Sequence, residues 1–401
     1  MRENIMLFNT KTRINKECRR YSEPLYAYLE RSGKKSSGFI RNLLEEWYSH
    51  YPEKHKKDIY SMLISKDDHS HLSAFFELYM HELLLKLGFT AEIHPEIEGK
   101  STHPDFLVFL DSIPLFYLEC ALVKGPKKDT VAEKLENKIY DMIDEMKNDD
   151  FFLYVEINAS STSTPSGAKW RRELERRLSE LDPDELYENL EREEWESLPQ
   201  WTLEDKGWKV TFRPIPRSKN IRGKHCVRPI GIIWKGFFWS DIYVYIRNVI
   251  REKANKYGRL KLPYVIAVNV LSLFCDDIAI SEALFGKLIT KINREPDGTI
   301  RRREDRKPNG VWWGSRRPQY TRVSGVIVFP YLYYGNIAKV TPTLWHNPWA
   351  RHPIDLSIFP FNQRVPNKEE MRMELRMGKP INEIFSLPEN WPFFEKDDDC
   401  C

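Results

Sequence analysis

The chain has 401 residues, of which 41% are hydrophobic and 30% are charged, and its formal net charge is +3. This composition excludes a disordered chain, and the near balance of charges gives no overall sign of a nucleic-acid binder. Every apolar run is shorter than the roughly 18 residues that a membrane-spanning helix needs. Because the first residues also lack the apolar segment of a signal peptide, we expect a cytoplasmic protein with no membrane association.

Residues 1–66 are predicted to form a helical lead-in, and residues 67–162 a core unit. The core begins with HLSAFFELYMHELLLKLG, whose apolar residues recur at helical spacing, and continues with the alternating strand FTAEIHPEI. Two strands in HPDFLVFLDSIPLFYLEC, the helix KKDTVAEKLENKIYDMIDEMK and the strand FFLYVEINAS complete it. The predicted order is therefore helix, three strands, helix and strand (αβββαβ).

The rest of the chain divides by composition. Residues 163–200 are dense in charge and predict a helical connector of two helices that meet at LDPDE. Residues 201–365 predict an α/β C-terminal region with the strands GWKVTFRPIP, PIGIIW (a short buried strand), LPYVIAVNVL and SGVIVFP. These strands either extend the first sheet or build a separate one. Residues 366–401 are predicted to be a mostly irregular tail.

The hairpin HPDFLVFLDSIPLFYLEC contains two carboxylates among apolar residues. A turn centred on Ser112 places Asp105 directly across from Glu119, and opposed like charges repel at a Cβ separation of roughly 4.5–5.5 Å. Either a cation lies between them or one of them holds a proton. Mg²⁺ suits such a site because it takes one or two carboxylates as ligands. A slip of one residue in the register would instead send the two side chains to opposite faces.

The first helix adds polar side chains near this hairpin. Glu77 and His81 lie four residues apart and share a helix face. Together with Asp105 and Glu119, Glu77 would complete a pocket of three carboxylates for Mg²⁺ or Mn²⁺, ions that neutralise a phosphate and lower the pKa of a bound water. His81 could be a general base or a neighbour of the metal, or a partly buried histidine bonded to the backbone.

These elements and residues resemble the PD-(D/E)XK nuclease superfamily, which has the restriction-endonuclease-like fold. The matching residues are Glu77 on the helix, Asp105 after Pro104 on the second strand, and Glu119 on the third strand. The resemblance implies that Asp105 and Glu119 bind the metal and that Glu77 assists. It therefore implies an α/β fold, a mixed sheet flanked by helices, and a Mg²⁺- or Mn²⁺-dependent endonuclease acting on nucleic acid, with DNA favoured.

One position departs from the family pattern. The family has a lysine two residues after the strand glutamate, and this chain has Ala121. Because some members recruit the lysine from elsewhere, Lys138 is our first candidate for this catalytic role and Lys134 our second, with Lys124 a further one. Without a lysine, the fold would be an inactive module that binds nucleic acid or a protein partner. Alternatively, the hairpin carboxylates form salt bridges with basic residues of the C-terminal region.

The chain as a whole also resembles a recurrent group of uncharacterised bacterial proteins, through landmarks such as FFELYMHELLLKLGF, HPDFLV, FYLECALV and LDPDE. That group looks like a stand-alone nuclease-like protein connected with phage defence, that is, with defence against foreign DNA. A homo-oligomer or a partner subunit is compatible with this resemblance.

A basic segment, RRREDRKPNGVWWGSRRPQYTR, covers residues 301–322. It predicts a nucleic-acid-binding loop in which cations follow the phosphates and aromatic rings stack on bases. The alternative is a solvated loop whose tryptophans pack on the C-terminal region. The candidate contact residues are Arg301, Arg302, Arg303, Trp312, Trp313, Arg316 and Arg317.

Three polar side chains of the C-terminal region allow two interpretations each. Asn269 interrupts the apolar strand, where a polar group needs hydrogen-bond partners, and we favour a structural role over a site. Arg247 and Arg251 share one face of the helix over 241–257 and either contact phosphate or line a solvated face, which we favour.

Overall fold

The structure is a computed structural model, and it describes residues 6–125, 130–146, 148–192, 195–223, 228–234, 242–272, 275–294, 300–315, 317–367, 369 and 372–393. The chain forms two compact units. Unit 1 comprises Met1–Thr12, Ser36–Pro126 and Phe238–Phe393, and unit 2 comprises Arg13–Lys35, Lys127–Phe237 and Phe394–Cys401.

Unit 1 is built on a mixed eight-stranded sheet of order β1-β2-β3-β8-β11-β12-β13-β14. Strands β3, β8 and β11 are parallel neighbours at its centre, and every residue of β8 is buried, as an apolar run between two covered faces requires. The strands are β1 (Thr90–Ile93), β2 (Phe106–Leu110), β3 (Ile113–Val123), β8 (Tyr264–Val270), β11 (Gly325–Pro330), β12 (Thr343–His346), β13 (Asn362–Asn367) and β14 (Arg372–Arg376).

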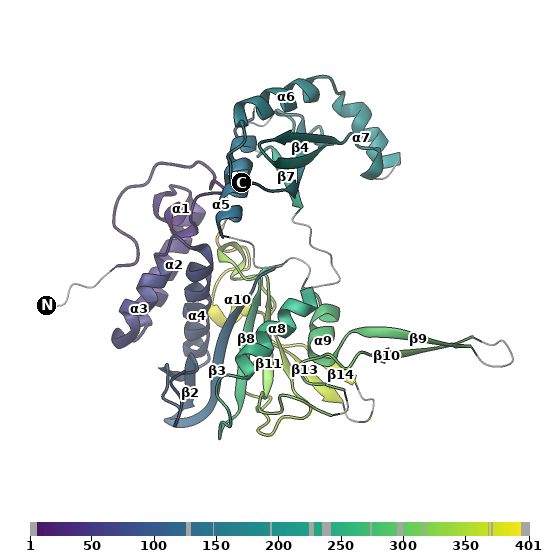
Figure 1. Cartoon of the computed structure of the whole chain (residues 1–401). Coiled ribbons are helices and arrows are strands. Elements are labelled where there is room, and N and C mark those ends of the chain that lie inside the picture. The colour runs from purple at the N-terminus through teal and green to yellow at the C-terminus, as the bar shows by residue number, and fades with distance from the viewer. Residues whose placement is uncertain are drawn as a thin grey trace. The chain divides into compact units, whose positions relative to one another are not determined.

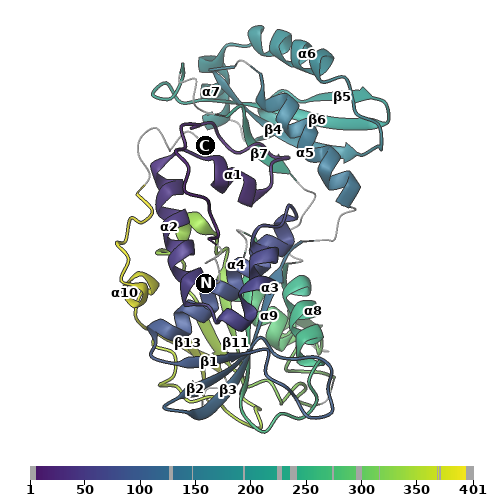
Figure 2. The same ribbon diagram turned by 90° about the vertical axis from the view of Figure 1, so that its left-hand side faces the viewer.

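Helices cover both faces of this sheet. Phe106 and Leu118 are paired on one face, and Phe106 lies against His81 of α4, whereas the neighbouring Glu119 points to the opposite face and contacts α8. Figures 1 and 2 show α4 and α8 on these two sides. The helices of unit 1 are α2 (Lys35–His50), α3 (Glu53–Leu63), α4 (Asp68–Lys86), α8 (Ile242–Ala254), α9 (Asp277–Phe285), α10 (Ile381–Phe385) and the 3₁₀ turn η3 (Tyr334–Asn336).

Local sequence explains the limits of α4. The side chain of Asp67 accepts a hydrogen bond from the amide of Ser70 at 3.0 Å and caps the first turn. Gly88, which follows the C-terminal end of this helix, has a φ of +83°, a conformation that favours glycine. Between these ends α4 is buried nearly all round, which makes it the central helix of unit 1.

Unit 2 has its own four-stranded sheet, of order β5-β6-β4-β7. Its apolar core includes Trp170, Leu174 and Trp208. The predicted turn LDPDE is confirmed, because Asp182 accepts the amide of Asp184 at 2.8 Å where α7 begins. The elements are α1 (Leu25–Arg31), α5 (Thr130–Asp144), β4 (Phe151–Ala159), α6 (Gly167–Ser179), α7 (Pro183–Arg192), the 3₁₀ turn η1 (Trp195–Ser197), β5 (Trp201–Asp205), β6 (Trp208–Pro216) and β7 (Ile230–Trp234).

The division into units differs from the predicted one. The helix and strand that we placed at the end of the core, α5 and β4, exist but belong to unit 2. In unit 1 their places after β3 are taken by α8 and by β8, which pairs in parallel with β3. The core order αβββαβ is therefore α4-β1-β2-β3-α8-β8, and most of unit 2 is inserted between β3 and α8.

Three smaller predictions can also be compared with the structure. The predicted strands of the C-terminal region divide between our two alternatives, because β8 and β11 extend the first sheet whereas β6 and β7 belong to the separate sheet of unit 2. The described part of the segment 366–401 contains two regular elements, β14 and α10, beside irregular stretches. The strand PIGIIW is not buried throughout, since Ile232 in β7 is 44% exposed.

Candidate functional site

The β2–β3 hairpin brings Asp105 and Glu119 together. Phe106 pairs with Leu118, so the next position along places Asp105 opposite Glu119 and confirms the predicted register. The turn itself is centred between Asp111 and Ser112, and a bulge at Val108 and Phe109 shifts the pairing by one residue. The carboxylate of Asp105 is fixed by the amide of Cys120, which donates to Oδ2 at 2.6 Å.

Two further side chains approach Asp105. Glu77 of α4, His94 at the end of β1, and Asp105 each offer a ligand atom within 4.8 Å of the other two. The hydroxyl of Tyr51 donates to Oε1 of Glu77 at 2.5 Å. His94 has a φ of +49°, and its amide donates to the carbonyl of Asp105 at 3.0 Å, which ties β1 to the start of β2. Two carboxylates and an imidazole form a donor set that can hold a divalent cation.

Glu119 is 1% exposed and contacts cations from the end of α8. Lys253 Nζ donates to Oε1 at 2.7 Å, and Lys256 Nζ donates to the same oxygen at 3.1 Å. The hydroxyl of Tyr257 lies 2.5 Å from Oε2 and 2.7 Å from the carbonyl of His103, so two acceptors share its single proton. Glu119 is thereby held by ion pairs, and the cluster with Glu77 and His94 does not include it.

Burial and mutual repulsion raise carboxylate pKa values at this site. Burial raises the pKa of Asp105 well above its usual range, and the charges of Glu119 and Glu77 add to this rise. Burial also raises the pKa of Glu77, against the opposing effect of the hydrogen bond from Tyr51. For Lys253, burial lowers the pKa, but the charge of Glu119 and their hydrogen bond outweigh it, so the net direction is upward. Additional positive charge would therefore stabilise the ionised form of Asp105.

The predicted substitute lysines belong to unit 2. Lys134 and Lys138 lie on α5 in unit 2, whereas the ammonium groups at Glu119 belong to Lys253 and Lys256. Lys253 is therefore the lysine that unit 1 itself brings to Glu119, and the roles of Lys138 and Lys134 stay predictions. A sequence signal existed, because REKANKYG, at the end of a helix, comes three residues before LPYVIAVNVL, the buried strand. A helix that leads into a parallel strand is the crossover helix.

His81 does not belong to the cluster. It is 2% exposed, its ring lies 5.0 Å from that of Tyr51, and its Nδ1 has no hydrogen-bond partner among the described residues.

Asn269 is structural, as favoured, because it exchanges two hydrogen bonds with the backbone of Leu332 at 2.9 and 3.0 Å.

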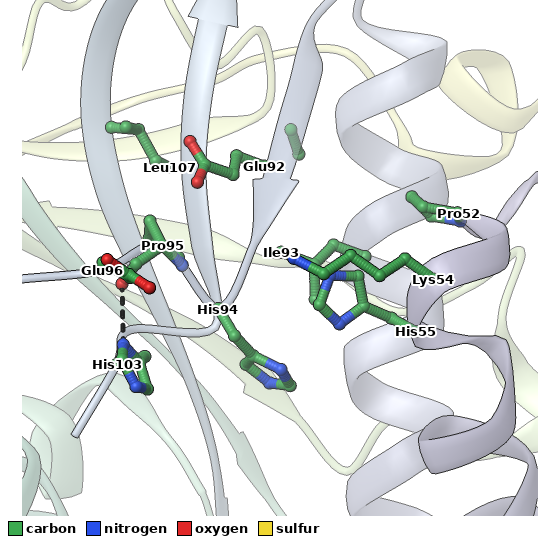
Figure 3. A pocket seen from close by; sticks show the side chains of 11 residues that line it. Pro52, Lys54, His55, Glu92, Ile93, His94, Pro95, Glu96, His103 and Leu107 are labelled. Carbon is green, nitrogen blue, oxygen red and sulfur yellow. Dashed lines mark hydrogen bonds between the residues drawn. The ribbon is translucent and has the colours of Figure 1, made fainter. Parts of the chain in front are cut away.

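A pocket of about 610 Å³ adjoins the cluster and shares His94 with it. Figure 3 shows His55, His94 and His103 around this pocket, with the His103 ring bonded to the carbonyl of Pro95 at 3.1 Å. The rings of His55 and His94 meet edge to face at 5.6 Å. Sequence reasoning missed these histidines because no local pattern indicates that His55 of α3 comes close to His94 and His103. The pocket is large enough for a small ligand group.

The basic segment is not a single loop. Arg301, Arg302 and Arg303 lie on β10 (Ile300–Arg306), which pairs with β9 (Leu288–Arg294) as a separate two-stranded sheet. Trp312 is fully buried 5.4 Å from the ring of Phe285, so it cannot stack on a base, and that part of the prediction is wrong.

The remaining candidate residues of that segment have different surroundings. Trp313 lies against the ring of Trp349 at 5.3 Å, and Arg317 is exposed. Arg316 lies outside the described residues. Arg247 and Arg251 both donate to the carbonyl of Asn309, at 3.1 and 3.0 Å, so they do not simply line a solvated face, and a contact with phosphate stays a prediction.

Comparison with known proteins identifies no relative. No protein-family model, no curated protein and no solved structure gives a significant match to the chain. Among the described helices, none is both long and apolar enough to cross a membrane.

Proposed function

We propose that the chain is a metal-dependent nuclease with a restriction-endonuclease-like core, and that it hydrolyses phosphodiester bonds of DNA. One observation carries the proposal. Three carboxylates, on α4, before β2 and on β3, converge with the ammonium group of Lys253, which lies 2.7 Å from Glu119. Such a combination binds a cation and leaves a cationic side chain beside the reacting phosphate.

The order of elements supports the resemblance to the PD-(D/E)XK superfamily. Unit 1 contains a helix, three strands, a helix and a strand as α4-β1-β2-β3-α8-β8, with Glu77, Asp105 and Glu119 at the matching positions. Lys253 on α8 supplies the ammonium group that is missing at Ala121. This contact supports the proposal, because the objection from the sequence was the lack of an ammonium group near Glu119.

The residues present fit a divalent ion. Glu77, His94 and Asp105 would hold it, because their ligand atoms lie within 4.8 Å of one another and Asp105 is buried beside two further carboxylates. Oxygen ligands suit Mg²⁺ and Mn²⁺, and the imidazole of His94 favours Mn²⁺. A bound ion supplies charge neutralisation for the phosphate and acidifies water.

The chain's own residues then orient the reactants. Lys253 and Lys256 hold Glu119 and present positive charge where a phosphate would enter, and Tyr257 fixes the other carboxylate oxygen. Hydrolysis forms a bond from the water oxygen to phosphorus and breaks the bond from phosphorus to a sugar oxygen. The leaving oxygen ends with one proton, and a proton from the attacking water passes to solvent.

The alternative is a module that binds without cutting. The observation in its favour is that Glu119 is already neutralised by two lysines of the C-terminal region, as a purely structural salt bridge would be. Asp105 has no such ion pair among the described residues, and this difference favours the nuclease. A role in defence against foreign DNA stays a prediction of the sequence.

Cleavage assays test the proposal. Purified protein is incubated with plasmid, linear duplex, single-stranded DNA and RNA in Mg²⁺, Mn²⁺ or EDTA, beside Glu119→Gln and the exposed control Glu98→Gln. We expect metal-dependent cutting of DNA that Glu119→Gln abolishes and Glu98→Gln preserves. If folded native protein cuts no substrate with either metal, the binding module becomes the better account.

A further inference from the structure

The β9–β10 ribbon is a feature that the proposed catalytic site does not use. Its seven residue pairs run from Leu288 opposite Arg306 to Arg294 opposite Ile300. At about 3.4 Å per residue it is about 20 Å long. Figure 1 shows it extending away from the eight-stranded sheet of unit 1.

Both faces of the ribbon are open to solvent. On one face Ile292 is 63% exposed and Ile300 is 60% exposed, and on the other Arg301 and Arg303 are exposed. An isolated pair of strands is marginally stable in water, because it has no core to bury. The extension therefore contributes little to folding, and its exposed side chains are available to a partner.

The charge of the ribbon indicates an anionic partner. Residues 288–294 and 300–306 contain six basic and two acidic side chains. Arg303 lies directly opposite Lys291, and like charges in such a pair destabilise the ladder. Asp305 contacts Lys291, so one of the two acidic side chains is already paired within the ribbon.

The base of the ribbon is connected by hydrogen bonds to α8, the helix that carries Lys253. Arg251 of α8 donates to the carbonyl of Gly310 at 2.8 Å, and Arg306 donates to the carbonyl of Gly286 at 2.9 Å at the end of α9. Lys253, which contacts Glu119, lies two residues after Arg251, a rise of about 3 Å along the helix. A partner held by the ribbon is therefore linked through α8 to the carboxylates.

We propose that the β9–β10 ribbon lies in the major groove of duplex DNA and holds the substrate there. The major groove of B-DNA admits a two-stranded ribbon, whereas the major groove of duplex RNA is too deep and narrow. Arg301 and Arg303 contact phosphates, and the face with Ile292 and Ile300 lies toward base edges, where thymine methyl groups offer apolar contact. The inference deepens the proposed function, since it names duplex DNA as the substrate.

Binding of the full-length protein to a labelled DNA duplex tests this proposal. Fluorescence anisotropy is measured in EDTA, and again in Ca²⁺, over a series of salt concentrations. For Arg301→Gln/Arg303→Gln we expect affinity to fall at least tenfold. The slope of log K against log salt should fall by about 1.8, because each lost phosphate contact removes about 0.9. The single variant Arg301→Gln, expected to remove about 0.9, keeps the test decisive if the double variant unfolds.

The matched control removes two exposed charges elsewhere, as Lys169→Gln/Arg172→Gln on α6, and should leave affinity and slope unchanged. The proposal is overturned by an equal loss in this control, by an unchanged slope in the ribbon variants, by equal binding of duplex RNA, or by native protein that binds no duplex. Cleavage is scored separately with Mg²⁺. If the ribbon variants bind DNA normally and the native protein cuts it, only the proposal on the ribbon is refuted. If the ribbon variants lose binding but the native protein does not cut, only the proposed nuclease activity is refuted.

Discussion

Glu119 and Lys253 illustrate which contacts a sequence reveals. Asp105 and Glu119 are 14 positions apart and joined by one turn, so counting from the turn was enough to pair them. Lys253 is separated from Glu119 by 134 positions, and their contact depends on β8 pairing with β3. A local pattern therefore predicted the two carboxylates. The alternative of a salt bridge to the C-terminal region is confirmed for Glu119, but no local pattern indicated which lysines form it.

Replacing Lys253 tests its role directly. We expect Lys253→Met to lower the cleavage rate roughly 100- to 1,000-fold, because a preorganised charge beside the phosphate is lost. Lys256→Met, which removes the longer of the two contacts, should have a smaller effect. The control Lys261→Met removes an exposed charge in the next loop and should leave the rate unchanged. Cleavage by folded Lys253→Met at the native rate would exclude the lysine from catalysis.

The buried ring of His81 predicts acid sensitivity. Burial lowers the pKa of His81 to about 4, and the charge of His50 adds to this effect. The unfolded chain takes up the proton near pH 6.5 and the native state does not, so stability falls as pH falls from 6.5 toward 4. The loss reaches about 3 kcal/mol for a shift of this size.

Urea unfolding at pH 7 and pH 4.5 measures this effect. His81→Leu should lose clearly less stability between the two pH values than the native protein, because its side chain does not titrate. An identical pH dependence in both proteins would show that His81 is not the responsible group.

The β2–β3 hairpin shows how two local irregularities preserve one register. Asp111 and Ser112 both have positive φ, of 49° and 69°, as in two-residue type I′ turns. The bulge at Val108 and Phe109 offsets the position of this turn, so Asp105 still lies opposite Glu119. The predicted pairing was right although the predicted turn geometry lacked the bulge, since bulges have no simple sequence signature.

This geometry predicts a stabilising substitution. Asn and Gly adopt positive φ more readily than Asp and Ser, so Asp111→Asn/Ser112→Gly should raise the free energy of unfolding by about 0.5 kcal/mol. Ser61→Gly in the exposed part of α3 is the contrasting control and should lower it by about 0.5 kcal/mol. Denaturant unfolding of both variants measures the two effects, and destabilisation by the turn variant would contradict the assigned turn.

The two units explain why individual elements were predicted better than their grouping. The helix α5 and strand β4 have strong local patterns and follow β3 in the chain, so sequence order assigned them to the first core. Only the pairing of β4 with β6 and β7, and of β3 with β8, separates them. These are long-range contacts, which periodicity within a single segment does not encode.

Because each unit has its own apolar core, we expect the two units to unfold in separate transitions. Leu174 is fully buried in the core of unit 2, so Leu174→Ala should destabilise that unit by roughly 2–5 kcal/mol. Leu84→Ala in α4 is the matched change in unit 1. In differential scanning calorimetry we expect two transitions, with each variant lowering a different one. A single transition lowered equally by both variants would show that the units unfold together.

The most direct test of the catalytic account is the single-turnover cleavage rate of labelled duplex DNA by native protein and by Asp105→Asn in Mg²⁺ and Mn²⁺. Asparagine keeps the oxygen that accepts the amide of Cys120 and removes the charge that would hold the ion. The account predicts cutting by the native protein and a loss of at least 100-fold in the folded variant. Equal rates in the two proteins, or no cutting by the folded native protein with either metal, would contradict it.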